Sequence, residues 1–255
     1  MEISVRRSNY SSYLGSKKLQ IFFSIQYHSA ADEKGTITNL PLTISPLFSE
    51  NMHHEIFSSG QVELLPYIKE FRQSFYMVGG TAIALHIGHR RSIDFDLFTF
   101  QRLNKSRIKG KLIHIPYQQI PIFEDVDQLH LIINEVKITF FSYPYPVQHP
   151  EKIDSIITIP SLLSLAAMKA FALGRRAKWK DYVDLYFIIR DYYSLEEIAL
   201  EAKKIFDQQF SEKLFRQQLA FHKDIDYSES VEYLVQPIPA DEIKNFLIDK
   251  ATDIF

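Results

Sequence analysis

Two aspartates, Asp94 and Asp96, alternate with apolar residues in the stretch IDFDLF at 93–98. Such alternation is typical of a β-strand, in which side chains two positions apart point to one face while Ile93 and the other apolar residues point to the opposite face. The pattern therefore predicts two carboxylates side by side at the edge of an apolar core. Like charges repel unless a cation lies between them, and a hard divalent cation, Mg²⁺ or Mn²⁺, is the usual partner of oxygen ligands. The alternative is a solvated strand or loop, which a D-x-D pattern alone also marks.

A pair of glycines precedes the aspartates, at the end of the apolar run 75–78. Gly79 and Gly80 are followed by Thr81 and an alanine-rich stretch, which indicates a strand, a glycine turn and a helix. Glycines in this place let backbone N–H groups approach a phosphate, and the start of the helix adds a favourable dipole. A phosphate cradle beside metal-binding carboxylates is typical of phosphoryl or nucleotidyl transfer. A glycine pair by itself is common in turns, but this whole order of elements is much rarer.

A second group of charged residues lies in the C-terminal half of the chain. The stretch LLSLAAMKAFALGRR at 162–176 has apolar residues at helical spacing, with Lys169 set against the apolar stripe and two arginines at its end. A further helix is predicted to follow, with Asp181 and Asp184 one turn apart and Lys180 placed to pair with Asp184. The structural alternatives are a lysine that snorkels from a buried helix and an ordinary surface ion pair.

The patterning divides the chain into three segments. Residues 1–51 lack sustained periodicity and are predicted to form an extension, with Met1 and Met52 both candidate starts. Residues 52–150 alternate helical and strand patterns and predict an α+β core with a mixed sheet. In residues 151–255 the long periodic patterns are helical. They predict a helical domain that completes a cleft beside the aspartates and the glycine pair.

Two local features of the middle segment predict turns. Pro66 is expected in the first turn of an amphipathic helix that precedes the glycine pair, or to bend that helix. The apolar stretches 128–133 and 136–141 flank Asn134 and Glu135, which predict a hairpin turn.

The composition is that of an ordinary globular protein and excludes several kinds of chemistry. The 255 residues are 46% hydrophobic, and a net charge of −2 gives no overall field that would attract a polyanion. The absence of cysteine excludes disulfides, thiolate catalysis and cysteine-ligated zinc. No apolar run approaches the ~18 to 20 residues of a transmembrane helix. We expect a cytoplasmic protein without a membrane segment.

Two blocks of the sequence together resemble the nucleotidyltransferase-like AbiEii/AbiGii toxin family of bacterial abortive-infection and toxin–antitoxin systems. They are GGTAIALHIGHRRSIDFDLFT at 79–99 and SLAAMKAFALGRRAKWKDYVDLYFI at 164–188, and the similarity covers roughly 62–193. The resemblance implies a minimal nucleotidyltransferase (DNA polymerase β-like) fold with a helical C-terminal half. It also implies transfer of a nucleotide from an NTP, in some members of the family onto tRNA 3′ ends.

The resemblance also implies a role for each matching residue. The aspartate pair would hold Mg²⁺ on the NTP phosphates, the basic residues of the second block would neutralise triphosphate charge, and the later acids would orient those bases or activate the acceptor hydroxyl. On this sequence the glycine motif falls on Gly79, Gly80 and Thr81, the metal pair on Asp94 and Asp96, and the second block on Lys169, Arg175, Arg176, Lys180, Asp181 and Asp184.

One departure from the pattern keeps two hypotheses open. Nucleotidyltransferases commonly carry a third carboxylate on a later strand, and the matching strand here, VKITF at 136–140, offers Thr139. A second metal would be poorly held or would borrow Asp184. The first hypothesis is an active toxin that acts on RNA or tRNA, with a separate antitoxin encoded nearby. The second is a catalytically weak or inactive relative that binds nucleotide or RNA.

Overall fold

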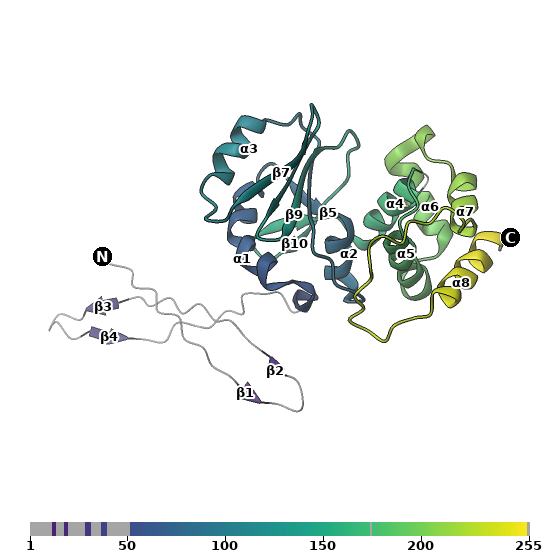
Figure 1. Cartoon of the computed structure of the whole chain (residues 1–255), viewed down its shortest axis with the longest axis horizontal. Coiled ribbons are helices and arrows are strands. Elements are labelled where there is room, and N and C mark those ends of the chain that lie inside the picture. The colour runs from purple at the N-terminus through teal and green to yellow at the C-terminus, as the bar shows by residue number, and fades with distance from the viewer. Residues whose placement is uncertain are drawn as a thin grey trace. The chain divides into compact units, whose positions relative to one another are not determined.

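The computed structural model describes residues 52–173 and 175–253, together with four short strands near the N-terminus. The chain forms two units, Met1–Glu50 and Asn51–Phe255 (Figure 1). In the first unit, β1 (Ser12–Tyr13) pairs antiparallel with β2 (Lys18–Leu19), and β3 (Ser29–Ala31) pairs antiparallel with β4 (Ile37–Asn39). The rest of the predicted N-terminal extension lies outside the described residues.

A five-stranded mixed sheet is the core of the second unit. Its order is β5-β6-β9-β8-β7, in which β6 and β9 run parallel and every other neighbouring pair is antiparallel. Buried Phe95, Leu97, Ile138 and Phe140 fill the apolar side of the two central strands. The strands are β5 (Tyr76–Val78), β6 (Phe95–Thr99), β7 (Gln119–Glu124), β8 (Gln128–Ile133) and β9 (Val136–Ser142).

The predicted hairpin turn is confirmed. Asn134 and Glu135 join β8 to β9 with φ angles of 51° and 65°, which is the left-handed conformation that two-residue hairpin turns require. This turn fixes the register of β9, and β9 in turn lies beside the strand that carries the aspartates.

The helix before β5 differs from its prediction at Pro66. Helix α1 (Ser59–Ile68) begins at a capping box made by Ser58 and Gln61, so Pro66 lies in the last turn and not in the first. A 3-10 turn, η2 (Lys69–Phe71), continues the chain. Because the capping residues set the start of the helix, they place the proline at its end, where the chain changes to the tighter turn.

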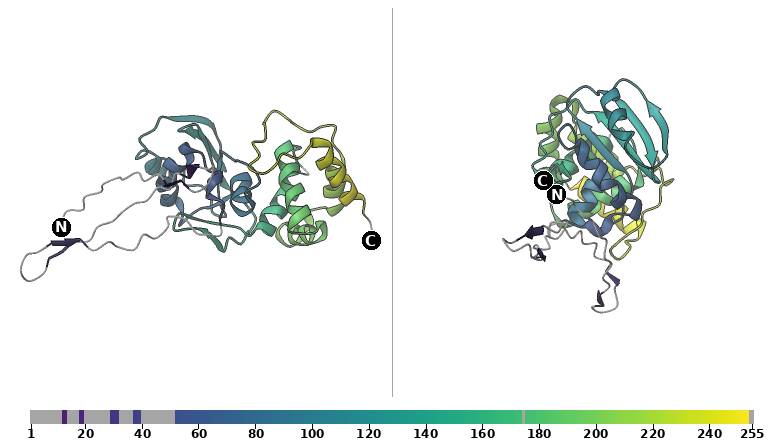
Figure 2. Two further views of the ribbon diagram at one scale, coloured as in Figure 1. Left: turned by 90° about the horizontal axis from the view of Figure 1, so that it is seen from below. Right: turned by 90° about the vertical axis from the view of Figure 1, so that its left-hand side faces the viewer.

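The C-terminal helical bundle is confirmed, but the start of the segment predicted to be helical is not: it forms a short hairpin of β10 (Glu151–Ile153) and β11 (Ile157–Ile159) before the first helix of the bundle. Its helices lie together beside the sheet (Figure 2). None of the helices in the described part of the chain is long and apolar enough to cross a membrane. The bundle consists of α4 (Leu162–Leu173), α5 (Trp179–Asp191), α6 (Leu195–Phe206), α7 (Glu212–Ala220) and α8 (Ala240–Thr252), with the 3-10 turn η3 (Asp207–Gln209) after α6.

Helix α2 (Gly79–Ile87) connects the sheet to the bundle. It packs against β5 and β6 on one side and against α4 and α5 on the other (Figure 1). Residues at both ends of this helix can therefore contact groups from both halves of the chain. The remaining helices of this unit are η1 (His54–Ile56), which also contacts α2, and α3 (Lys105–Leu112).

Candidate active site

Asp94 and Asp96 lie at the start of β6, on the partly exposed side of the sheet. Phe95 and Leu97 between and after them are fully buried on the apolar side, as the alternation predicts. Ile93 departs from that prediction, because the strand begins only at Phe95 and the isoleucine side chain is 49% exposed.

The charges of the two carboxylates repel each other. Burial and the charge of Asp96 raise the pKa of Asp94, and burial also raises the pKa of Asp96. Lys137 partly offsets both shifts, and a hydrogen bond to Thr139 further offsets that of Asp96. Two partly buried carboxylates whose ionised forms are disfavoured make a donor set that fits a hard divalent cation.

Gly79 allows the glycine turn to approach Asp96 closely. Its φ is +76°, which favours glycine, and a Cβ atom built on it would overlap Oδ2 of Asp96. A Cβ atom on Gly80 would come within 2.6 Å of Nη2 of Arg90. At both positions a charged side chain occupies the space that a Cβ atom would need. The start of α2 therefore lies directly beside the aspartates.

Replacing Gly79 with alanine is expected to destabilise the protein and to displace the Asp96 carboxylate. The left-handed backbone costs an alanine roughly 1 to 2 kcal/mol, and the overlap with Asp96 adds to that cost. Thermal unfolding and Mn²⁺ binding would both be measured. The control is Gly110→Ala on α3, where nothing lies within 4 Å, and which should be neutral or stabilising. Equal melting temperatures for the two variants would contradict the prediction.

Thr81, a predicted nucleotide-binding residue, is almost fully buried in the first turn of α2. Its hydroxyl donates to the carbonyl oxygen of Asp94 and lies 3.4 Å from that of Ser92. The side chain thus holds the loop that carries the first aspartate. Nucleotide binding by Thr81 remains a prediction.

A buried ion cluster lies next to the glycine turn and is centred on Asp184. The carboxylate of Asp184 accepts hydrogen bonds from Nε of Arg90 at 2.7 Å and from Nη2 at 2.9 Å, while Nε2 of His89 lies 2.7 Å away. Lys169 pairs with the same carboxylate at 3.0 Å and also with Asp181. We call these residues the ion cluster: His89, Arg90, Lys169, Asp181 and Asp184, each at most 7% exposed.

The charges of the ion cluster satisfy one another. Burial alone would raise the pKa of Asp184, but Arg90, Lys169 and the contact with His89 hold it well below its usual range. Burial lowers the pKa of His89, which the contact with Asp184 offsets only in part. Asp184 is therefore an ionised carboxylate that protein groups engage fully, and a role for it in holding a second metal remains a prediction.

Two arginines at the end of α4 have different surroundings. Arg176 is half exposed and its Nε donates to Oδ2 of Asp181 at 3.1 Å. Arg175 is exposed and stacks on the ring of Phe171, with 4.2 Å between its Cζ atom and the ring centroid. Arg176 thus belongs to the edge of the ion cluster, whereas Arg175 contacts an aromatic side chain.

Lys180 does not pair with Asp184, so that part of the prediction is wrong. Its Nζ lies 3.2 Å from Glu229, and Lys178 pairs with the same carboxylate. The hydrogen bond from Lys178 is the largest cause that lowers the pKa of Glu229, and together with Lys180 it outweighs the opposing effect of burial and brings this pKa to about 2. Asp184 is reached instead by Arg90 because the loop after α2 folds back onto α5.

Glu229 belongs to the connection between α7 and α8, residues 221–239, which we call the strap. It returns to the loop after α2, where the Leu234 N–H donates to the His89 carbonyl at 3.0 Å and the Arg91 N–H donates to the Glu232 carbonyl at 2.8 Å. Figure 1 shows the strap crossing from the bundle toward the sheet. No local pattern in the sequence marked the strap as part of the site.

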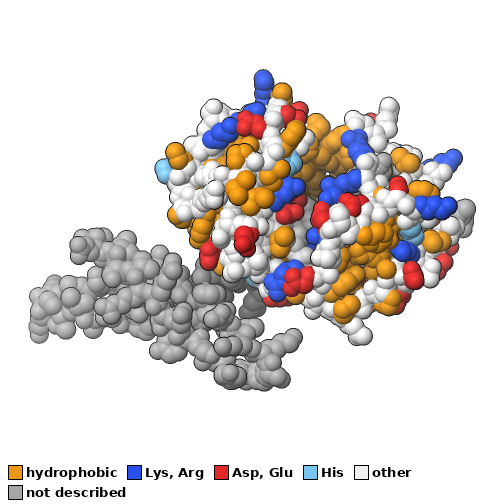
Figure 3. All heavy atoms as spheres, viewed as in Figure 1, with side chains coloured by type: hydrophobic (Ala, Val, Ile, Leu, Met, Phe, Trp, Pro, Cys, Tyr) orange, Lys and Arg blue, Asp and Glu red, His pale blue; other side chains and the backbone are white. Residues whose placement is uncertain are grey.

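The structure brings most of the predicted residues to one region. Lys169 and Arg176 act electrostatically on Asp96, and Lys180 and Glu229 act on Asp94, although the chain separates these groups widely. Figure 3 shows basic and acidic side chains gathered around the hollow between the sheet and the bundle. Lys137 and Glu229 were missed. Only Lys137 could have been found, since it lies two positions before Thr139 on the same strand.

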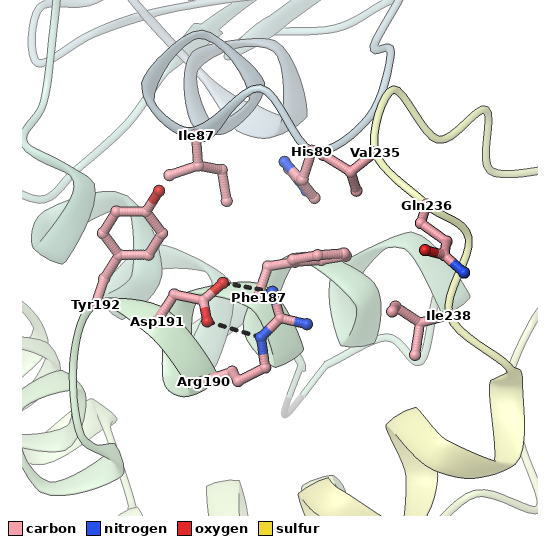
Figure 4. Close-up of a pocket in the computed structure, with 9 residues that line it drawn as sticks. All are labelled: Ile87, His89, Phe187, Arg190, Asp191, Tyr192, Val235, Gln236 and Ile238. Carbon is pink, nitrogen blue, oxygen red and sulfur yellow. Dashed lines mark hydrogen bonds and ion pairs between the residues drawn. The ribbon is translucent and has the colours of Figure 1, made fainter.

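Metal binding at this place would rely on the aspartate pair. Among residues 52–173 and 175–253, no cluster of three or more His, Cys, Asp or Glu side chains could hold an ion. A cavity of about 260 Å³ reaches the ion cluster at His89, but none of its lining residues is a predicted site residue (Figure 4). They are Ile87, His89, Phe187, Arg190, Asp191, Tyr192, Val235, Gln236 and Ile238.

Comparisons with known proteins match this chain to one family. The model of a family described as "Nucleotidyl transferase AbiEii toxin, Type IV TA system" matches residues 66–130 and 113–253. An uncharacterized protein of Aquifex aeolicus (strain VF5) is 36% identical over 138 residues, which are 51% of this chain and 65% of the relative. The match thus spans just under two thirds of the length of that relative.

A solved structure is also similar. It is MenT4, a nucleotidyltransferase toxin from Mycobacterium tuberculosis H37Rv, with a TM-score of 0.53 and 13% sequence identity. The similarity covers 75% of this chain and 80% of that one. At this identity it shows the fold, and the predicted nucleotidyltransferase fold is confirmed.

Proposed function

Because the chain belongs to the AbiEii family of nucleotidyl transferase toxins of type IV toxin–antitoxin systems, we propose that it transfers a nucleotide from an NTP to an RNA acceptor. The observation that carries this proposal is the contact of Asp96 with the glycine turn, beside the partly exposed Asp94. Carboxylates and the start of a helix in this arrangement can hold a metal and a phosphate together.

The proposal assigns different work to the two halves of the chain. Asp94 and Asp96 would hold Mg²⁺ or Mn²⁺, which when bound would stabilise charge on the phosphates during transfer. The backbone N–H groups of Gly79 and Gly80 would bind the phosphates at the start of α2. Arg176, which is half exposed, would bind phosphate oxygens.

The ion cluster would position these groups without touching the nucleotide. Lys169, Asp181 and Asp184 are all buried, and Asp181 holds Arg176 while Asp184 holds Arg90 against Gly80. We therefore propose a positioning role for the three residues that sequence analysis placed among the catalytic candidates. Thr81 and Arg175 remain predicted contributors to nucleotide binding, together with Lys180.

The family supports further proposals about the acceptor and the partner of the protein. We propose tRNA or another RNA as acceptor, a separate antitoxin encoded nearby, and a cytoplasmic location. The second hypothesis, a weak or inactive nucleotide-binding relative, is favoured by one observation: Thr139, not an acid, lies opposite Asp96 on the adjacent strand.

Incorporation of labelled nucleotide tests the proposal. The full chain would be incubated with total RNA, Mg²⁺ or Mn²⁺ and each α-labelled NTP in turn, and the RNA would be separated on a gel. We expect one or more NTPs to label a discrete RNA species. Saturable NTP binding without any labelled RNA would support the inactive relative, and the absence of both binding and labelling would reject the site.

Neutralising Glu229 is expected to tighten nucleotide binding several-fold. In the Glu229→Gln variant, Lys178 and Lys180 lose the carboxylate that pairs with them and become available to phosphate. Binding of each NTP would be measured by calorimetry. Glu232→Gln is the control, because this strap residue pairs with Arg91 instead. Unchanged or weaker binding by Glu229→Gln would show that the two lysines do not contact the nucleotide.

A further inference from the structure

Lys137 is a further charged group on the side of the sheet that carries the aspartates. The parallel register pairs Asp96 with Thr139 and Phe95 with Ile138, which sets Lys137 beside Asp94. Alternation along β9 buries Val136 and Ile138 and leaves Lys137 half-buried on the same side as the aspartates.

The charge of Lys137 acts on Asp94, Asp96 and His130. Burial raises the pKa of Asp96, and Lys137 is the largest influence in the opposite direction. Lys137 likewise acts to lower the pKa of Asp94 against the effect of burial. On the next strand it contributes, together with burial, to the lowered pKa of His130. The register agrees with this: Asp96 and His130 both lie opposite Thr139, two positions from Lys137 on the same side of the sheet.

Lys137 differs from Lys169 in being electrostatically close to acids without a direct partner. Lys169 pairs with Asp181 and Asp184, and Lys180 pairs with Glu229. Among the described residues, no carboxylate lies within ion-pairing distance of Lys137. A half-buried ammonium group that has no carboxylate partner, beside a carboxylate pair, is suited to bind an oxyanion.

We propose that Lys137 supplies the second positive charge of this site, so that Asp94 and Asp96 bind one divalent cation and Lys137 binds the nucleotide phosphate beside it. This inference rests on the proposed function. Two carboxylates with one adjacent lysine carry a net charge of −1, which one divalent cation already reverses. A second cation would find no third acid among the described residues and would be repelled by the lysine.

Counting bound Mn²⁺ tests the inference without relying on catalysis. The full chain would be titrated with Mn²⁺, with and without a non-hydrolysable NTP analogue, and free Mn²⁺ would be followed by electron paramagnetic resonance. We expect one ion per chain at the aspartates. Lys137→Met should bind this ion roughly tenfold more tightly and the NTP analogue more weakly, because the fixed positive charge is gone. Lys137→Glu should bind two ions.

Three controls separate the possible failures. Lys137→Arg keeps the charge and should bind one ion, and Lys203→Met, at an exposed position of α6, should match the wild type. Each variant would be checked by thermal unfolding. Two ions per wild-type chain, or unchanged Mn²⁺ and analogue affinities in Lys137→Met, would overturn the role of Lys137. If Asp94→Asn leaves Mn²⁺ binding unchanged, the proposed function itself fails.

Discussion

Replacing Asp94 with asparagine is expected to abolish nucleotide transfer and, at the same time, to raise the melting temperature of the unliganded protein. The loss of activity should be roughly a thousandfold or more, since charge stabilisation by a metal is worth several kcal/mol. The gain in stability has a separate cause, the repulsion between Asp94 and Asp96.

The sign of the stability change follows from the pKa of Asp94. Burial and Asp96 raise this pKa in the folded protein, so folding disfavours the ionised carboxylate. The resulting loss of folding stability is complete above the raised pKa. It disappears as the pH falls through the unfolded value of about 3.9. Asparagine removes that cost at neutral pH. The difference in melting temperature between variant and wild type should therefore vanish in acid.

Thermal unfolding from pH 3 to 8 and RNA labelling at neutral pH would measure the two effects, over a range chosen around the ordinary carboxyl pKa of about 3.9. Asp127→Asn, in the exposed turn before β8, is the control and should change neither. A variant that loses both activity and stability would mean that Asp94 holds the fold together. A variant that keeps its activity would remove Asp94 from the proposed metal site.

Replacing Asp184 with asparagine is expected to lower the stability of the protein strongly, whereas Asp94→Asn raises it. Asparagine has nearly the same shape but no charge, so Arg90 and Lys169 would be buried without their shared counter-ion. Breaking a buried ion pair from one side costs about 3 to 5 kcal/mol. For a folded unit of this size, the melting temperature should fall by roughly 10 °C.

The matched control lies on the same helix. Asp191 forms a two-bond ion pair with Arg190, but both side chains are more than one-third exposed. Asp191→Asn should therefore cost at most about 1 kcal/mol. The double variant Asp184→Asn with Lys169→Met should recover part of the stability, because Lys169, which keeps only Asp181 as a partner in the single variant, no longer adds a second buried positive charge beside Arg90.

The pH dependence of Asp184 has the reverse sign from that of Asp94. Its pKa is lowered well below the usual range, so its contribution to stability is complete above the unfolded value of about 3.9 and is lost as the pH falls through the folded pKa. If Asp184→Asn melts like the wild type yet loses nucleotide transfer, Asp184 acts on the substrate and the positioning role is wrong.

Much of the site's local geometry could be predicted from the sequence. The alternation around Asp94 and Asp96 predicted which side chains share a side of the sheet, and the order of strand, glycines and helix predicted the turn that approaches Asp96. These features depend on backbone geometry that repeats over two to four residues, so neighbouring residue types are enough to reveal them. The position of Pro66 shows the limit: it was expected in the first turn of α1, but the capping box at Ser58 and Gln61 begins the helix seven residues earlier and leaves the proline in the last turn.

The partners of the charged residues were decided by the tertiary structure alone. Asp184 pairs with Arg90 and not with Lys180, because α2 packs on α5 and brings the loop after α2 against a buried carboxylate. Lys180 pairs with Glu229 because the strap returns to the start of α5. In sequence, a lysine or an aspartate on a helix is the same whether it will be buried or solvated. Burial and long-range packing choose its partner, and they are not encoded in any local spacing.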